Sequence, residues 1–359
     1  MFSLTVEQED LADGVSNLLA ARATGPYVRE VMAGTASWRD VWADVAELGI
    51  ASLVVPEADG GLGLGAVEVA AVSEVCGHFL VPAPVVATAG QFVPPIAAAG
   101  GAAASCLTRV LDEGATGTLA FAEPLTPLPS VELRGGRLTV EDLLVPDAVR
   151  LDYFAFILGE EGSLFIAVLP SVEASIENVD GLDPTRPLGR LSCDAASVAI
   201  SPIGSDTAAL VVPLVSAASE LVGMADQMLS LSIQYAGERE QFGSPIGSFQ
   251  AVKHRLVDSH LQIERARSLT FSAAVLSDDP DRSAPEQLAA ARLAMAVASE
   301  AATETARSAV QVHGGVGVTA EHDVSLLYLR ARQASMQLGG RDANYLAAAD
   351  AFIRDGKFD

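Results

Sequence analysis

The sequence is poor in basic residues, aromatic residues and cysteine, and each shortage excludes a class of protein. Lys and Arg number 22 against 46 Asp and Glu, and the resulting formal charge of −24 repels nucleic acid and anionic membrane surfaces. Aromatic residues make up only 5% of a chain that is 50% hydrophobic, which favours helices packed closely through alanine over an aromatic-filled barrel. Cys76, Cys106 and Cys193 are odd in number and lack metal-ligand spacing, so we expect reduced cysteines in a cytoplasmic protein.

Long uninterrupted apolar segments are also missing. The first residues, MFSLTVEQEDLADGV, contain neither a basic region nor an apolar core of the kind found in signal peptides. The apolar stretch at 75–106 is broken by Pro82, Pro84, Pro94 and Pro95. We therefore expect no signal peptide and no membrane span.

Hydrophobic spacing divides the chain into three parts. Residues 1–115 carry apolar residues at three- and four-residue spacing, which predicts an N-terminal helical domain. Residues 116–205 contain short β-rich runs punctuated by Gly, Pro and Asp, which predicts a small middle β-domain with a tight hairpin at Gly135 and Gly136. The helical period returns over 206–359 and predicts an antiparallel bundle. The fold class is therefore α+β and mostly α.

GLGLGA (61–66) matches the dinucleotide fingerprint G-x-G-x-x-A, but only weakly. A dinucleotide fold needs repeated strand–helix alternation and an acidic residue about 20 positions further on. Here helical patterns surround the motif, and the region near 80–85 is LVPAPV. We favour a structural turn.

A Gly- and Pro-rich connection between two predicted helices collects polar and aromatic side chains. YAGEREQFGSPIGSFQ (235–250) places Arg239 and Gln241 beside Phe242 and Phe249 in an otherwise acidic chain. Arginine can bind pyrophosphate through two hydrogen bonds, and aromatic rings can cover an adenine or a ribose. The same composition suits an ordinary helix end, where the helix dipole favours a basic residue. Local chemistry leaves both interpretations open.

A second Gly-rich connection follows a long apolar helix. QVHGGVGVT (311–319) has three glycines within four positions, which permits close backbone approach to a ligand and leaves N–H groups for phosphate oxygens. A bare connection between two helices, the next one capped by Thr319, is the alternative. His313 has no second ligand at metal spacing, so we expect a structural role for it.

At these two motifs the sequence resembles the acyl-CoA dehydrogenase superfamily. EREQFGSPIGSFQAVKHRLVD (238–258) and QVHGGVGVT (311–319) resemble its two C-terminal signatures, and the blocks at 2–11 and 47–77 extend the resemblance over essentially the whole chain. The resemblance implies an N-terminal helical domain, a β-domain and a C-terminal four-helix bundle. It also implies FAD between the β-domain and the bundle, shared by dimer mates. The residues that would grip the ADP half of the neighbour's FAD are Arg239, Gln241, Phe242, Gln250, Gln311, Gly314 and Gly315.

The family's reaction is α,β-dehydrogenation of an acyl-CoA, in which a carboxylate removes a proton while hydride passes to the flavin. Aligning LYLRARQASMQLGG (327–340) with the family's usual base segment puts Leu338 where the glutamate belongs. Leucine cannot accept a proton. Glu220 is a weak substitute, because it lies seven residues beyond the alternative position for the base near Val211 to Leu214.

The β-domain segments that would face the flavin also differ from the family pattern. EDLLVPDA (141–148) replaces the segment with Trp-Ile-Thr, and the loop after Glu123-Pro124 is short. The chain lacks the catalytic base but keeps the residues that would bind the neighbour's FAD. In this it resembles the non-catalytic subunit of actinobacterial α2β2 acyl-CoA dehydrogenases. Those enzymes act on bulky substrates such as steroid side-chain CoA esters. The resemblance also allows an electron-transfer flavoprotein as electron acceptor. Two rival hypotheses are a self-sufficient homo-oligomeric enzyme that uses Glu220, and a flavin-free scaffold on the same fold.

Overall fold

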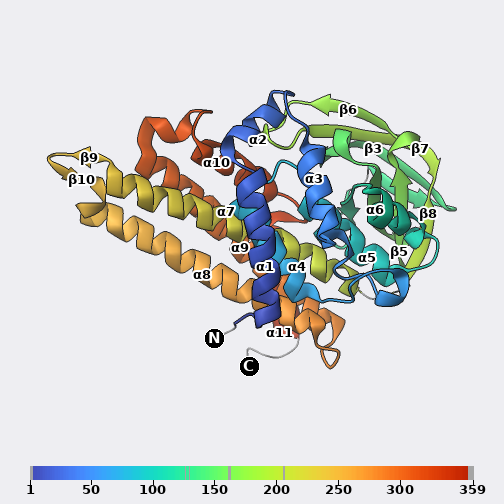
Figure 1. The fold of residues 1–359 in the computed structure, drawn as a ribbon. Helices are drawn as coiled ribbons and strands as arrows, with labels where there is room; N and C mark the ends of the chain where they lie inside the picture. Colours follow the sequence, from blue (N-terminus) through green and yellow to red (C-terminus); the bar gives the residue numbers. More distant parts are fainter. Residues whose placement is uncertain (1–2, 126, 129, 161–162, 205–206, 355–359) are drawn as a thin grey trace.

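Helices make up the described N-terminal and C-terminal regions, and strands lie between them (Figure 1). The computed structural model describes residues 3–125, 127–128, 130–160, 163–204 and 207–354. The N-terminal helices are α1 (Val6–Arg22), α2 (Gly25–Met32), α3 (Trp38–Glu47), α4 (Ala66–His78), α5 (Val93–Ala99) and α6 (Leu107–Glu113), with the π-helical turn η3 (Val86–Phe92) before α5. The strands are β1 (Gly117–Ala122), β2 (Val131–Arg134), β3 (Arg137–Pro146), β4 (Tyr153–Glu160), β5 (Ser163–Pro170), β6 (Ser175–Val179), β7 (Leu188–Ser197) and β8 (Ala199–Gly204). The C-terminal helices are α7 (Val211–Glu238), α8 (Gln250–Asp278), α9 (Ala284–His313), α10 (Asp323–Ala334) and α11 (Gly340–Arg354), with the short ribbon β9 (Glu240–Gln241) and β10 (Ser244–Pro245) between α7 and α8.

Several helices begin at residues whose side chains satisfy the free N–H groups of the first turn. Thr5 caps α1 in a reciprocal arrangement with Gln8, and Ser283 does the same for α9 with Glu286. The cap of α4 comes from far away in the sequence, because the carboxylate of Asp278 accepts hydrogen bonds from the N–H groups of Ala66 and Val67 at 2.8 and 3.3 Å. The end of α8 is thereby joined to the start of α4.

The glycines of 61–66 serve the packing of the chain itself. A Cβ at Gly61 would lie 2.0 Å from the carbonyl oxygen of Val55, and Gly63 has a φ of 63°. A Cβ at Gly65 would lie 2.4 Å from Oδ2 of Asp278. Because that carboxylate also occupies the N-terminus of α4, the motif is a structural turn with no room for a phosphate.

The β-domain consists of two four-stranded sheets with strand orders β1-β4-β5-β8 and β2-β3-β7-β6. Side chains of β4 alternate between them: Phe154 and Phe156 pack in the core shared with the second sheet, whereas Ala155 and Ile157 join the core of the helical domains. Between β2 and β3, Arg134 pairs with Arg137 across Gly135 and Gly136, both at positive φ, which confirms the predicted hairpin.

The bundle is built around α9, which packs against α7, α8, α10 and α11. Its buried face is rich in alanine, and such small side chains let helices approach closely. One helical segment, Ala208–Glu238, is long and apolar enough to cross a bilayer, but 83% of its apolar window is buried inside the molecule. In this structure α7 is therefore a core helix of the bundle.

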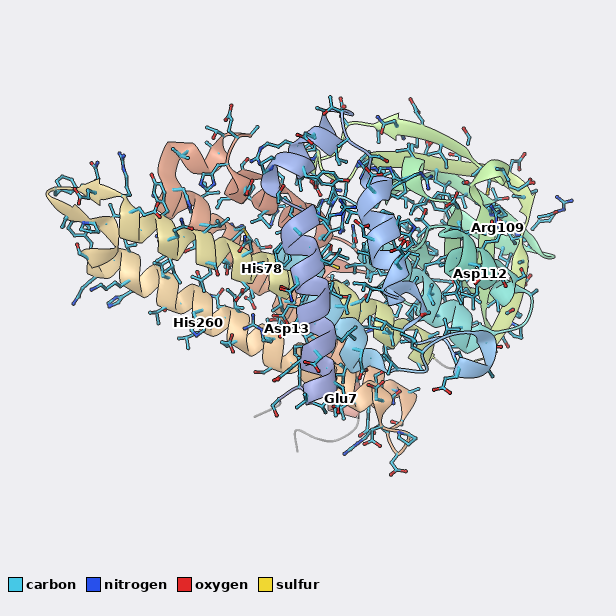
Figure 2. The ribbon with its side chains drawn as sticks, in the orientation of Figure 1. Glu7, Asp13, His78, Arg109, Asp112 and His260 are labelled. Carbon is cyan, nitrogen blue, oxygen red and sulfur yellow. The ribbon has the colours of Figure 1, made fainter. Side chains whose placement is uncertain are left out.

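Hydrogen bonds and ion pairs join the three regions, and Figure 2 labels two of the side chains involved, Arg109 and His78. Arg109 on α6 donates to the hydroxyl of Tyr153 on β4 at 3.0 Å. His78, which Figure 2 shows beside α1, lies with Nδ1 3.4 Å from Oδ2 of Asp226 on α7. These contacts fix the N-terminal helices against both the sheet and the bundle.

Some local expectations need correction. Between α5 and the 3₁₀ turn Ala103–Cys106 the chain runs through Gly100 and Gly101, both at positive φ. The predicted cap Thr319 is wrong: α10 begins at Asp323, and its cap is His322, whose Nδ1 accepts from the N–H of Val324. Among the three free cysteines, Cys193 is only half-buried.

Candidate functional site

The two Gly-rich motifs meet at one end of the bundle. We call this region the bundle tip and define it by Arg239, Gln241, Phe242, Gln250, Gln311, Gly314 and Gly315. Figure 1 shows the β9–β10 ribbon at the end of the α7–α8 pair that points away from the β-domain. The tip is thus remote from any site in the β-domain of the same chain.

A stack of three rings holds the two halves of the bundle tip together. Tyr235 on α7 stacks on His313 at the end of α9 with ring centroids 4.5 Å apart, and His313 meets His322 edge-on at 4.7 Å. Nδ1 of His313 lies 2.8 Å from the carbonyl oxygen of Ala309. One turn beyond Tyr235, the N–H of Arg239 donates to the Tyr235 carbonyl at 2.8 Å. His313 is therefore structural, as expected, and it sets the spacing between the two motifs.

The three glycines of the second motif differ in why the chain requires a glycine at that position. Gly314 has a φ of 61°, and a Cβ at Gly317 would lie 2.8 Å from Cβ of His313, so conformation and packing explain these two glycines. Neither conformation nor packing requires a glycine at position 315, because its φ lies outside the left-handed region and nothing lies within 4 Å of an added Cβ. Its bare backbone suits the close approach of another molecule.

The side chains at the bundle tip face outward. Phe242 is 95% exposed and has a positive φ of 54°. Its ring meets that of Phe249 edge-on, with ring centroids 6.2 Å apart. Arg239 is exposed, and its guanidinium makes no ion pair or hydrogen bond with the part of the chain that the structure describes. A free guanidinium, an exposed ring and an open glycine backbone form a surface suited to a phosphate-bearing aromatic ligand.

The N-terminal domain holds this surface in place through Arg29 on α2. Nη1 of Arg29 donates to Oδ1 of Asp323 at 2.6 Å, Nη2 donates to the carbonyl of Glu321 at 2.6 Å, and Nε donates to the carbonyl of Ala320 at 3.2 Å. These acceptors follow directly after the Gly-rich segment. Its exit is therefore fixed by a residue that the sequence motifs did not indicate.

A separate cavity of about 430 Å³ lies between the β-domain and the bundle. Its walls come from η3, β1, β3, the 180–188 segment and the connection between α10 and α11. Mostly aliphatic side chains line it, with polar groups from Gln91, Thr118, Asp147, Asp180, Arg186, Gln333 and Gln337. It is the kind of cavity in which a small molecule would bind.

Leu338 lies on the wall of this cavity, in the connection between α10 and α11. Leu338, Gly339 and Gly340 all have positive φ, and Asn344 Nδ2 donates to the carbonyl of Leu338 at 2.8 Å. A leucine in the left-handed region is uncommon and costs backbone strain. The loop therefore presents position 338 to the cavity with a hydrocarbon side chain.

Glu220 lies outside the cavity lining. Its carboxylate is 2% exposed and forms a two-point ion pair with Arg186, in which Nη1 donates at 3.3 Å and Nη2 donates to the other oxygen. This pairing favours a structural role for Glu220 over a role as substitute base.

The Arg186–Glu220 pair belongs to a buried cluster in which three arginines meet three carboxylates. Arg330 donates to Asp183 at 3.0 Å, and Arg150 donates to Asp147 at 3.1 Å. Burial raises the pKa of Asp147, although Arg186 and Arg150 oppose the shift. The members of the cluster are Asp147, Arg150, Asp183, Arg186, Glu220 and Arg330, which come from the β-domain and the bundle.

Sequence reasoning missed the polar residues of the cavity. Gln91 lies on a π-helical turn, Asp147 follows β3 at a φ of 59°, and Arg186 lies in the loop before β7. The π-turn is a feature often found at functional sites, but a sequence does not reveal it. The carboxylates of the described lining are Asp147, held by Arg150, and Asp180, exposed at the rim.

Two family models match most of the chain. The N-terminal domain model of acyl-CoA dehydrogenases matches residues 5–105, and the C-terminal domain model matches residues 209–348. The chain belongs to the acyl-CoA dehydrogenase family. It is 32% identical over 340 residues to the acyl-CoA dehydrogenase IpdE2 of Mycobacterium tuberculosis, covering 92% of this chain and 93% of the relative. IpdE2 of Mycolicibacterium smegmatis is 30% identical over 94% of this chain and 96% of its own length.

Solved structures of the family share the whole fold. The steroid ACAD Tcur3481-Tcur3483 aligns with a TM-score of 0.86 at 24% identity, covering 98% of this chain and 99% of the other. The ChsE4-ChsE5 complex from Mycobacterium tuberculosis aligns with a TM-score of 0.81 at 24% identity over 99% and 98% of the two chains. The helical, β and helical order expected from the sequence is confirmed.

The bundle tip suits the ADP half of FAD, whereas the β3 wall of the cavity offers no side-chain donor to a flavin. Arg239 and the open backbone at Gly315 fit a pyrophosphate, and Phe242 fits an aromatic ring. Along the β3 wall of the cavity stand Leu143, Leu144 and Val145, whose side chains carry no hydrogen-bond donor for the polar edge of a flavin.

Proposed function

We propose that this chain is a base-lacking subunit of an FAD-dependent acyl-CoA dehydrogenase assembly. In this proposal the bundle tip binds the ADP half of an FAD whose flavin lies in a second, glutamate-bearing subunit. The partner removes the α-proton, and FAD, when bound, accepts the hydride. The observation that carries the proposal is the contrast between the hydrocarbon wall at Leu338 and the free Arg239, Phe242 and Gly315 at the tip.

The substrate in this proposal is a bulky acyl-CoA of the steroid side-chain type, and the assembly is an α2β2 tetramer in the cytoplasm. The name of the steroid ACAD Tcur3481-Tcur3483 supports a steroid-type substrate, and the ChsE4-ChsE5 complex supports an assembly of two different chains. An electron-transfer flavoprotein serves as electron acceptor. Burial of Glu220 against Arg186 weakens the rival in which this chain supplies its own base.

Co-expression with a glutamate-bearing family member tests the proposal. We expect a yellow, FAD-containing complex only when both chains are present. We also expect 2-enoyl-CoA to form only in that case. Arg239→Ala should release FAD from the complex, whereas Arg282→Ala, which removes an exposed arginine of the α8–α9 turn, should leave the FAD content unchanged. If this chain alone bleaches its own bound flavin on addition of an acyl-CoA, the proposal is wrong. Colourless protein with every candidate partner would instead favour a flavin-free scaffold.

A further inference from the structure

A larger cavity, of about 720 Å³, lies between the N-terminal helices and the bundle. Its walls come from α1, α4, α7 and α8, and we call it the α1–α8 cavity. The charged members of its lining are Glu74, His78, Asp226, Glu264 and Arg267. It shares no lining residue with the cavity at Leu338 or with the bundle tip, so a ligand in it would leave the proposed FAD site free.

The charged side chains meet here because α4 and α7 touch at Gly223, which is itself part of the lining. A Cβ at Gly223 would lie 1.9 Å from the carbonyl oxygen of Glu74, so the helices can approach this closely only with a glycine. His78 follows Glu74 by one turn of α4, and Asp226 follows Gly223 by about one turn of α7. The contact therefore places these side chains on one wall.

Arg267 on α8 is fully occupied by carboxylates. Its Nε donates to Glu74 at 2.8 Å, its Nη2 donates to Asp226 at 3.1 Å, and its Nη1 donates to Glu264. An anionic ligand would find no free nitrogen on this guanidinium and would lie beside three negative charges. Repulsion therefore excludes a carboxylate or phosphate ligand.

Two of these carboxylates keep an oxygen for a ligand. Oε2 of Glu74 and Oε2 of Glu264 accept no hydrogen bond from the described residues. Their side chains are 20% and 47% exposed, so a molecule in the cavity can reach them. Burial raises the pKa of Glu74, although Arg267 opposes the shift. A second cation beside Glu74 would stabilise its ionised form.

Apolar side chains complete the lining on three sides. Leu4 and Ala12 come from the N-terminal segment, Val75 and Phe79 from the end of α4, and Phe271 from α8. Aromatic rings attract cations as well as hydrocarbon groups. A volume of about 720 Å³ falls within the range of small-molecule sites. The matching ligand joins one positive charge to a compact hydrocarbon group.

We propose that the α1–α8 cavity binds a small amphipathic amine. Its ammonium group donates hydrogen bonds to the free oxygens of Glu74 and Glu264, and its hydrocarbon part lies against Phe79 and Phe271. The amine is bound without chemical change. Because it contacts both the N-terminal helices and the bundle, it stabilises the folded chain.

Three probes that share one ring and differ in charge test the proposal on the full chain. Cyclohexylmethylamine is positive at pH 7, cyclohexylmethanol is neutral and cyclohexanecarboxylate is negative. Calorimetric titration in phosphate buffer, which contains no competing amine, measures each affinity. We expect the amine to bind roughly tenfold more tightly than the alcohol, since hydrogen bonds to charged groups supply about that factor. Equal binding of amine and alcohol would overturn the proposal, and so would preferred binding of the carboxylate.

A chain with a formal charge of −24 attracts every cation, so two controls separate the cavity from general attraction. Methylamine, which lacks the ring, should bind at least about tenfold more weakly than cyclohexylmethylamine, because it buries little apolar surface. Glu264→Gln should reduce the preference for the amine over the alcohol. Glu113→Gln is the matched variant, because Glu113 also pairs with an arginine of its own helix but lies outside the cavity. Equal binding of the two amines, or equal effects of the two variants, would overturn the proposal.

Photolabelling of the unmodified chain guards against a variant that fails to fold. A diazirine derivative of cyclohexylmethylamine should label peptides of α1, α4 and α8, and unlabelled amine should compete for the site. Labelling confined to the bundle tip or to the cavity at Leu338 would overturn the proposal. The proposed function has its own readout, since FAD content of the co-expressed complex is measured without any amine. Either proposal can therefore fail while the other stands.

Discussion

The guanidinium of Arg29 on α2 donates to the carboxylate of Asp323 at the start of α10, at 2.6 Å and across 294 positions of sequence. The same side chain donates to the carbonyl oxygens of Ala320 and Glu321. The N-terminal domain therefore fixes the exit of the Gly-rich segment by hydrogen bonds to its backbone. Because a guanidinium presents several donors in one plane, a lysine cannot reproduce this arrangement.

We expect Arg29→Met to weaken FAD retention by the complex roughly tenfold, or about 1.4 kcal/mol, because the segment bearing Gly314 and Gly315 loses its support. Arg29→Lys should recover only part of this loss. Equilibrium dialysis of the yellow complex measures the effect. Arg22→Met is the matched control, because Arg22 pairs with Asp44 inside the N-terminal domain and does not contact the tip. Equal FAD loss in both variants would contradict the role assigned to Arg29.

The Gly315→Ala variant should lower FAD binding without lowering the thermal stability of the chain. An added methyl meets open space at this position, so we expect the thermal midpoint of the isolated chain to stay constant or to rise slightly. In the complex the same methyl should block approach of the cofactor and lower the FAD content. Flavin absorbance per protein and differential scanning calorimetry report the two effects separately.

The matched control for Gly315 is Gly14 on α1, where an added Cβ also meets nothing within 4 Å. Gly14→Ala should stabilise the chain by about 0.5–1 kcal/mol, as alanine does in exposed helices, without any change in FAD content. If Gly315→Ala behaves like Gly14→Ala in the complex, the open backbone at 315 has no role in binding.

Glu220→Gln should cost about 3 kcal/mol of unfolding free energy, because it removes the carboxylate that holds both Nη atoms of buried Arg186 and leaves Asp147, at 3.7 Å, as the carboxylate beside that charge. Denaturant unfolding measures the loss. Turnover per folded complex should be unchanged, since Glu220 lies outside the cavity lining. Selective loss of flavin reduction in a normally folded variant would instead identify Glu220 as the base.

Because His313 is buried, we expect the free energy of unfolding to fall as the pH drops below neutrality. Burial lowers the pKa of His313 below its usual 6.5, opposed by the hydrogen bond to Ala309 and aided by nearby His322. Below pH 6.5 the unfolded chain therefore takes up a proton that the folded chain refuses, and the free energy of unfolding falls by up to about 1.4 kcal/mol per pH unit. Urea unfolding between pH 7 and 5 should show this slope, and His313→Phe, which keeps a ring against Tyr235, should reduce it. An identical slope in the variant would exclude His313 as the cause.

Short-range patterns allowed good predictions of local structure. The glycine pair at 135–136 specified a hairpin, and helical spacing identified the long helices of the bundle. Leu338 and the residues of the bundle tip were identified from the resemblance to the acyl-CoA dehydrogenase family, and the structure places them on a cavity wall and on an exposed surface. Their assigned roles stay predictions, as do the exact domain boundaries.

Long-range pairing could not be predicted from the same patterns. Asp278 caps a helix more than 200 positions away, and Arg186 neutralises Glu220 from another domain. Gln91 faces the cavity because of a π-helical turn that leaves no clear mark in the sequence. Each of these relationships depends on how domains pack, and packing is decided by the whole chain rather than by neighbours in sequence.

The nearly bare ring of Phe242 has a consequence for how the cell must make this protein. A phenylalanine that water surrounds on almost all sides is a ready contact for any other apolar surface, including a second copy of the same ring. In the proposed two-chain assembly, a chain made in excess of its partner would expose that ring throughout its lifetime. Balanced synthesis of the two polypeptides would then protect the chain from aggregation and proteolysis.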